Sequence, residues 1–225
     1  MRAKGRIAAG SRDVPADEEK DVRRWESCGQ AWIGVLRHVW TAGEAGLEEG
    51  GPIIEGPPLL FEVTSLSWED PILHEHGDRA RIVRRAQERT RRAVRGRYWP
   101  RLHDLEGNDQ IRWVVDLLRA RPWTTSAWIS LTIPGEPAEG LPSLTALSFR
   151  IRGYRLIMTA MFRSQNVYRG YLTYIPLREV QVQVADELGL PAGPLRVYVD
   201  VPHVHVADAE RVACVLLAMP EPNAA

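Results

Sequence analysis

Residues 141–206 decide the fold; they read LPSLTALSFRIRGYRLIMTAMFRSQNVYRGYLTYIPLREVQVQVADELGLPAGPLRVYVDVPHVHV. SLTALSFRI and RLIMTAMFR predict two strands joined at Arg152-Gly153-Tyr154. Residues 174–188 predict a helix that Gly189 and Pro191 close, and LRVYVDVPHVHV predicts a last strand. Two strands, a helix and a strand in this order indicate a mixed α/β sheet flanked by helices.

The chain before this stretch predicts further elements of the same domain. One apolar face at helical spacing runs from Trp25 to Val39, and Gly43 ends that helix. GGPIIEGPP is rich in turn residues, and LFEVTSLSW alternates like a strand. An amphipathic helix is expected over Asp109–Arg121 and a strand in SAWISLTI. Residues 1–20 are charged and aperiodic, so we expect a mobile tail before a single domain over 21–220.

Composition excludes several classes of partner. Lys+Arg and Asp+Glu both number 29 in 225 residues, so net charge predicts neither nucleic-acid nor membrane binding. No apolar run approaches the ~20 residues of a membrane span. Two cysteines, Cys28 and Cys214, fit a reducing cytoplasm. No Cys/His cluster has zinc-site spacing, so no metal site is expected.

A predicted helix over residues 78–94 is dense in arginine. The arginines form either a patch for anions or nucleic acid, or a solvated face with Ile82, Ala86 and Ala93 inward. Base-stacking aromatic residues are not interleaved with them, which favours the solvated face.

An ordered series of short motifs runs through the chain. Pro142-Ser143 precedes the two strands, Arg163-Ser164 ends the second, a turn at Gly170 opens the helix, and His203 lies near the end of the last strand. Upstream lie Tyr98-Trp99-Pro100-Arg101-Leu102 and Asp109-Gln110-Ile111. Over about residues 30–210 the series resembles thymidylate synthases and the related nucleotide hydroxymethylases. The resemblance implies a thymidylate-synthase-type sheet, a homodimer that buries a sheet face, a pyrimidine-like small-molecule substrate, and methylenetetrahydrofolate as cofactor.

The resemblance also implies catalytic roles. Ser143 stands at the position of the nucleophilic cysteine, Tyr98 at that of the catalytic tyrosine, and His203 at that of the histidine in His-x-Tyr. A serine hydroxyl is a far weaker nucleophile than a thiol unless a general base lies beside it. Three explanations stay open: a histidine activates Ser143, the protein is catalytically inactive, or serine is an engineered replacement of cysteine.

The substrate positions implied by the resemblance are partly altered. Arg163 and Ser164 match the anion-binding pair, and Gln165 follows them. Asn166 replaces an aspartate that contacts the pterin, Tyr174 replaces the asparagine that reads the base, and His205 replaces the tyrosine that holds the ribose. Thr125 and Ser126 stand in place of two phosphate-binding arginines. The replaced side chains favour an altered substrate.

His203 and His205 are two residues apart on a predicted strand and therefore face the same side. They would serve as a base and a ligand contact, or as a metal pair without its other ligands. We expect a diverged one-carbon transferase, transferring a methyl or hydroxymethyl group in secondary metabolism, with a cleft bordered by Ser143, Tyr98, Arg163 and His203. The alternatives are a non-catalytic ligand-binding dimer and a different acid/base enzyme built on the same cleft.

Overall fold

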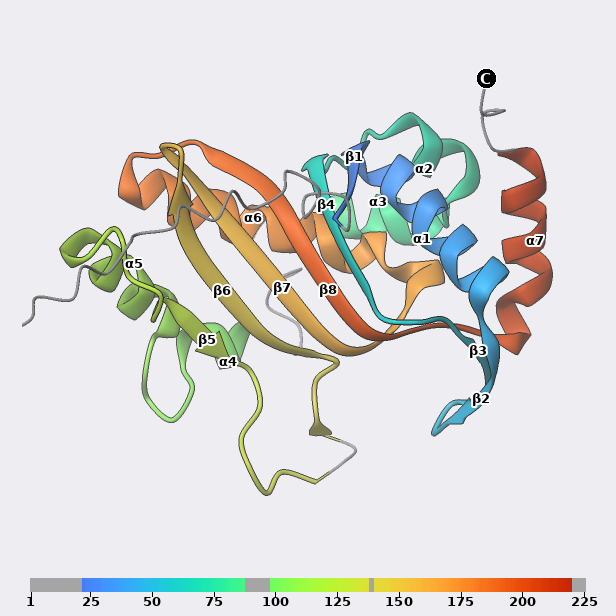
Figure 1. Cartoon of the computed structure of the whole chain (residues 1–225), viewed down its shortest axis with the longest axis horizontal. Coiled ribbons are helices and arrows are strands. Elements are labelled where there is room, and N and C mark those ends of the chain that lie inside the picture. Colours follow the sequence, from blue (N-terminus) through green and yellow to red (C-terminus); the bar gives the residue numbers. More distant parts are fainter. Residues whose placement is uncertain (1–21, 88–97, 138–139, 220–225) are drawn as a thin grey trace, which may run out of the picture.

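A computed structural model describes residues 22–87, 98–137 and 140–219 of the chain. The fold is mixed α/β, and its centre is an open eight-stranded sheet in the order β1-β4-β8-β7-β6-β5, with β3 pairing β8 and β2 pairing β3 (Figure 1). The strands are β1 (Arg23–Ser27), β2 (Glu44–Glu48), β3 (Gly51–Glu55), β4 (Leu59–Ser65), β5 (Trp128–Ser130), β6 (Leu144–Arg152), β7 (Arg155–Asn166) and β8 (Ala192–His205). The predicted fold class, a mixed sheet flanked by helices, is confirmed.

The three longest strands come from the stretch 141–206. β6 and β7 form an antiparallel hairpin, and the turn between them places Gly153 at φ 52° and Tyr154 at φ 62°. β8 runs parallel to β7, and the register sets Asn166 beside His203. On its other edge β8 pairs first with β4 and then with β3, where Glu55 lies opposite His203. Strand β8 therefore holds His203 between β7 and β3, and it holds His205 beside Ile53 of β3.

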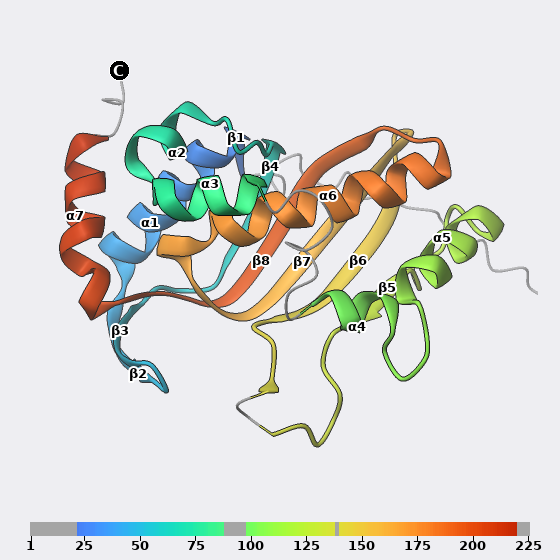
Figure 2. The same ribbon diagram turned by 180° about the vertical axis from the view of Figure 1, so that it is seen from behind.

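The helices pack on one side of the sheet. Figure 2 shows α6 and α3 in front of the strands, whereas Figure 1 shows the opposite face of the sheet. In β7 the side chains of Leu156, Met158, Ala160 and Phe162 are buried toward the core. The helices are α1 (Cys28–Ala42), α2 (Pro71–His76), α3 (Arg79–Gln87), α4 (Trp99–His103), α5 (Gln110–Ala120), α6 (Tyr171–Leu188) and α7 (Ala209–Ala218).

Several elements begin elsewhere than the sequence predicts. Helix α1 starts at Cys28 because Ser27 and Gln30 form a capping box, and Trp25 lies instead on β1, opposite Val63 of β4. Helix α6 starts at Tyr171, three residues before the predicted start, because the chain enters it directly from a 3-10 turn. Residues 44–55, interpreted partly as turns, form the hairpin β2–β3, and α7 was not predicted.

The arginine-rich segment is described as far as Gln87. In α3 the residues Arg79, Arg81 and Arg84 are exposed, whereas Ile82 is buried, which is the pattern of a solvated helix face. The rest of the predicted helix and the predicted tail over residues 1–20 lie outside the described residues. Within the described ranges, no helix is both long enough and apolar enough to cross a membrane.

Candidate functional site

Ser143 and Tyr98 lie together although 45 residues separate them in the chain. The Tyr98 hydroxyl is 3.3 Å from the Ser143 Oγ, and both residues are half-buried. The backbone carbonyl of Ser143 accepts a hydrogen bond from the Arg163 amide at 3.0 Å. The Arg163 guanidinium donates to the carbonyl of Pro142 at 3.3 Å, and the residue is exposed. Three predicted site residues thus form one group at the open end of the β6–β7 hairpin, opposite its turn.

This first group contains a hydroxyl pair and a cation. Tyr98 stands at the start of α4, and Ser143 immediately precedes β6, so two elements of secondary structure hold the pair. His203 makes its hydroxyl contact with Ser164 and not with Ser143, because its Nδ1 lies 3.4 Å from the Ser164 Oγ. The phenol of Tyr98 is therefore the group that would exchange a proton with Ser143.

Gln165 and Tyr174 pair with each other inside the core. The Tyr174 hydroxyl donates to the Gln165 Oε1, and the exposed fractions of the two residues are 1% and 7%. Burial raises the pKa of the Tyr174 phenol far above its ordinary value. A substrate contact by either side chain would require this hydrogen bond to open.

Asn166 acts locally as a helix cap. Its Oδ1 accepts from the Tyr168 amide at 3.1 Å and so opens the 3-10 turn Val167–Arg169. The same turn is tied to α1, since the Trp32 indole donates to the Tyr168 carbonyl at 3.1 Å. Helix α1 therefore supports the segment that leads from β7 into α6.

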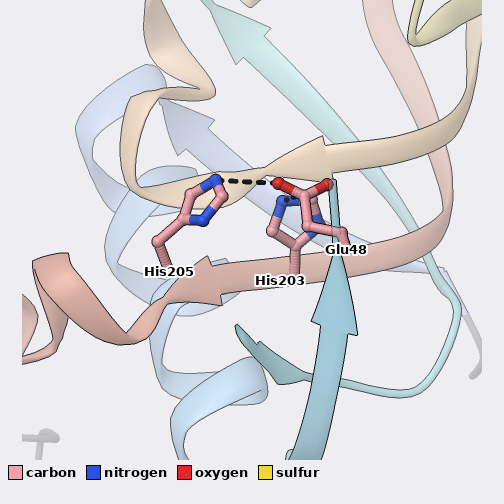
Figure 3. A group of neighbouring side chains, drawn as sticks. All are labelled: Glu48, His203 and His205. Carbon is pink, nitrogen blue, oxygen red and sulfur yellow. Dashed lines mark ion pairs between the residues drawn. The ribbon is translucent and has the colours of Figure 1, made fainter. Parts of the chain in front are cut away.

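Glu48, His203 and His205 form a second group of functional side chains. The His205 Nε2 lies 3.0 Å from one carboxylate oxygen of Glu48, and the His203 Nε2 lies 3.7 Å from the other. Figure 3 shows the carboxylate facing both imidazole rings, which project from β8. The prediction that the two histidines face the same side is confirmed. The carboxylate that meets them was not predicted.

The histidine environments differ. His203 is 3% exposed, and its Nδ1 lies 3.3 Å from the Val201 carbonyl. A carbonyl oxygen only accepts hydrogen bonds, so this contact favours a proton on Nδ1; in that neutral tautomer the Nε2 lone pair faces Glu48. Burial lowers the pKa of His203, against the opposing effect of the Glu48 carboxylate. His205 is half-buried and holds the closer contact with Glu48.

Glu48 reaches the histidines through the β2–β3 hairpin. It is the last residue of β2 and pairs with Gly51, while Ile53 of β3 pairs with His205. A Cβ atom on Gly50 would lie 2.8 Å from the His205 Cε1 and 2.9 Å from a Glu48 oxygen. Glycine at the turn therefore leaves room for the imidazole beside the carboxylate. The two-residue turn is Glu49-Gly50, so the signal in the sequence was the glycine at position 50.

A pocket of about 560 Å³ lies elsewhere, between α6 and residues 66–68. Its lining includes Trp68, Arg178 and Asp186, and it contains none of the predicted site residues. No protein-family model matches the chain, and no curated protein matches it. The fold and the site define a mixed α/β protein with a serine–tyrosine pair at one place and a carboxylate–dihistidine group at another.

Proposed function

We propose that the protein is a diverged one-carbon transferase of the thymidylate-synthase type, acting on a pyrimidine-like or otherwise altered small molecule. The observation that carries the proposal is the 3.3 Å contact between Tyr98 and Ser143. These two residues were assigned the roles of catalytic tyrosine and nucleophile from separate motifs. Because the two motifs are far apart in the sequence, the contact between their residues supports both assignments.

The chemistry of this pair sets what Ser143 can do. A neutral hydroxyl attacks poorly, and a phenol is a weak general base near neutral pH because its ordinary pKa is about 10. Ser143 would therefore bind or orient the substrate more effectively than it would add to it. Arg163, exposed beside the pair, supplies a positive charge for an anionic substrate group.

Methylenetetrahydrofolate is the proposed one-carbon donor. Arg163, Ser164 and Asn166 lie in the last four residues of β7, where the resemblance expects substrate and pterin contacts. Asn166 lacks the carboxylate of the aspartate it replaces, and its Oδ1 already caps the following turn. We therefore expect weak folate binding in which the Asn166 amide nitrogen, and not its oxygen, contacts the pterin.

Replacement of Ser143 by cysteine tests the proposal. A cysteine of ordinary pKa provides a small thiolate fraction at neutral pH, whereas serine provides essentially none. We expect Ser143→Cys to release tritium from a 5-tritiated pyrimidine nucleotide at least about tenfold faster than the wild type, and Tyr98→Phe in the same background to remove that gain. The matched control is Ser65→Cys, which adds an exposed thiol at the end of β4.

Two results would count against the one-carbon transferase. Calorimetry that detects no methylenetetrahydrofolate binding to the wild type or to Ser143→Cys, with or without nucleotide, would exclude the folate-dependent reaction. Equal tritium release by Ser143→Cys and Ser65→Cys would remove the special role of position 143. Folate or nucleotide binding without turnover in any variant would instead identify a non-catalytic ligand-binding protein.

A homodimer through the sheet is part of the proposal. Among the described residues, the face of the sheet seen in Figure 1 carries no helix. Half-buried Ile157 and Met161 lie on β7 there, and the Arg150 Nε is buried without a hydrogen-bond partner in the described part of the chain. A partner subunit would supply that acceptor. Light scattering at micromolar concentration should give a dimer that Met161→Glu dissociates, and a monomeric wild type would contradict it.

We also propose a cytoplasmic location. Cys28 is buried and Cys214 is exposed, and both are free thiols in the structure. Free thiols persist in a reducing compartment.

A further inference from the structure

We propose that Glu48, His203 and His205 bind one divalent transition-metal ion, of the kind that two imidazoles and a carboxylate select. The observation that carries this inference is that one ligand atom from each residue lies within 4.8 Å of the others. The three residues come from two strands, β2 and β8, that are far apart in the sequence (Figure 3). The inference does not rest on the proposed transferase activity, although the His203 Nδ1 lies 3.4 Å from Ser164, one of the residues that the proposed transferase would use.

The distances suit a metal ion after small side-chain rotations. A metal with bonds of about 2.1 Å holds its neighbouring ligand atoms about 3.0–3.5 Å apart. The His205 Nε2 lies 3.0 Å from one Glu48 oxygen, and the His203 Nε2 lies 3.7 Å from the other. The ring planes of the two histidines are nearly perpendicular, at 88°, and their centroids are 5.4 Å apart. The lone pairs can therefore converge without the rings colliding.

The outer contacts of His203 favour a metal ligand over a simple hydrogen bond. The Val201 carbonyl favours a proton on Nδ1, which is the tautomer that a metal-bound histidine adopts when Nε2 is the ligand. With the proton on Nδ1, the Nε2 lone pair faces a carboxylate at 3.7 Å and has no hydrogen to share with it. Two electron-rich groups that face each other in a half-buried place are stabilised by a cation between them.

The hairpin is built to leave space at this place. A side chain at Gly50 would collide with both His205 and Glu48, and Gly51 has a φ of 116°, which favours glycine. The turn thus brings a carboxylate to the imidazoles while leaving the side of the site open. Three protein ligands and an open position are typical of catalytic zinc sites and of non-haem iron(II) sites.

Calorimetry on the tag-free full chain tests the site, with Zn²⁺, anaerobic Fe²⁺ and Mg²⁺ as separate titrants. We expect one Zn²⁺ or Fe²⁺ per chain and no comparable binding of Mg²⁺, because nitrogen ligands suit the transition metals. Glu48→Gln and His205→Gln should each weaken binding by at least about 100-fold, since loss of an outer contact alone costs 10–100-fold. These residues are half-buried, so the variants should fold.

Glu49→Gln is the matched control, because Glu49 is the exposed neighbour of Glu48 in the same turn. It should bind the metal as the wild type does. The melting temperature should rise with Zn²⁺ in the wild type and in Glu49→Gln, and should not rise in Glu48→Gln. Co²⁺ should give visible absorption bands that His205→Gln changes.

Three outcomes would overturn the proposal: no Zn²⁺ or Fe²⁺ binding by the wild type, equal binding by wild type and Glu48→Gln, or Mg²⁺ binding as tight as that of Zn²⁺. The first would leave Glu48 as an ion-pair partner that ties the hairpin to β8. The second would place the ion elsewhere on the surface. The third would indicate a carboxylate site in which the imidazoles are not ligands.

Discussion

Asp70→Ala should destabilise the protein by about 3 kcal/mol, because one buried carboxylate serves two helices. Asp70 is 6% exposed and caps α2 through the amides of Ile72 at 3.0 Å and Leu73 at 3.4 Å. Its second oxygen accepts from the Gly29 amide in the first turn of α1 at 2.8 Å. Loss of a cap costs about 1 kcal/mol. A buried amide left without an acceptor costs about 1–3 kcal/mol, for which we take about 2.

The Asp70 carboxylate fits closely between helices α1 and α2. A Cβ on Gly29 would lie 2.3 Å from an Asp70 oxygen and 2.6 Å from the Ile72 Cβ, so α1 and α2 approach closely there. Asp70→Asn keeps the size and one acceptor oxygen, and should lose about half as much stability as Asp70→Ala. Displacement of α1 would also strain the Trp32 contact with the 3-10 turn before α6.

Urea denaturation followed by circular dichroism measures the effect. With a slope of about 3 kcal/mol per molar urea, a loss of about 3 kcal/mol lowers the midpoint by about 1 M. Asp78→Ala is the control, because the Asp78 carboxylate is exposed and accepts from the Arg81 amide at 3.1 Å. It should cost about 0.5–1 kcal/mol. A loss below about 1 kcal/mol for Asp70→Ala, or one no larger than that of Asp78→Ala, would refute the double-cap reasoning.

Two further predictions concern a thiol and a carboxylate. Burial raises the pKa of the Cys28 thiol far above its ordinary value, whereas Cys214 is exposed. A thiol reagent should therefore label Cys214 alone in the native protein and both cysteines in urea. Rapid labelling of Cys28 in the native protein would contradict this. The hydrogen bond from Arg101 lowers the pKa of Glu136 below its usual 4.5. The charged carboxylate therefore stabilises the folded protein fully above pH 4.5, and this stabilisation is lost as the pH falls through the lower pKa of the native state. The urea midpoints of wild type and Glu136→Gln should therefore differ near pH 7 and converge as the pH falls below 4.5 and through the lower native pKa. A gap that widens in acid would show the sign to be wrong.

Local patterns predicted the centre of the fold. Strands β6 and β7 follow from their alternation and the Gly153-Tyr154 turn, and α5 follows from its apolar stripe and the Asp109 cap. These signals lie within one element and its immediate ends. The contact between Tyr98 and Ser143 required the resemblance as well, because no local rule brings residues 45 positions apart to 3.3 Å.

Glu48 was not predicted, for a physical reason. Residues 44–55 are rich in glycine and glutamate, which have low strand propensity, so the segment was interpreted partly as turns. The hairpin is specified by its pairing with β8, where Ile53 lies opposite His205 and Glu55 opposite His203. That pairing joins residues about 150 positions apart in the chain. The histidines could be read from β8 alone, but their carboxylate partner depends on long-range register.

Two positions that differ from the pattern of the proposed family have specific side-chain partners in the structure. Tyr174 replaces an asparagine in the resemblance, and its hydroxyl bonds Gln165; His205 replaces a tyrosine, and its imidazole contacts Glu48. Unselected replacement in a core leaves buried polar groups without partners, at about 1–3 kcal/mol each. Both replacements have specific partners instead. Under the proposed relationship to thymidylate synthases, these partners favour coordinated change of the site over decay.

A double-mutant cycle on Tyr174 and Gln165 tests coordinated change. Tyr174→Phe and Gln165→Met should each cost about 1–3 kcal/mol, because each leaves a buried polar atom without its partner. The double variant removes both polar atoms, so it should cost at least about 1 kcal/mol less than the sum of the single variants. Urea denaturation of the four proteins gives the coupling. If the single losses add to within about 0.5 kcal/mol, the hydrogen bond is incidental and the argument from paired replacements fails.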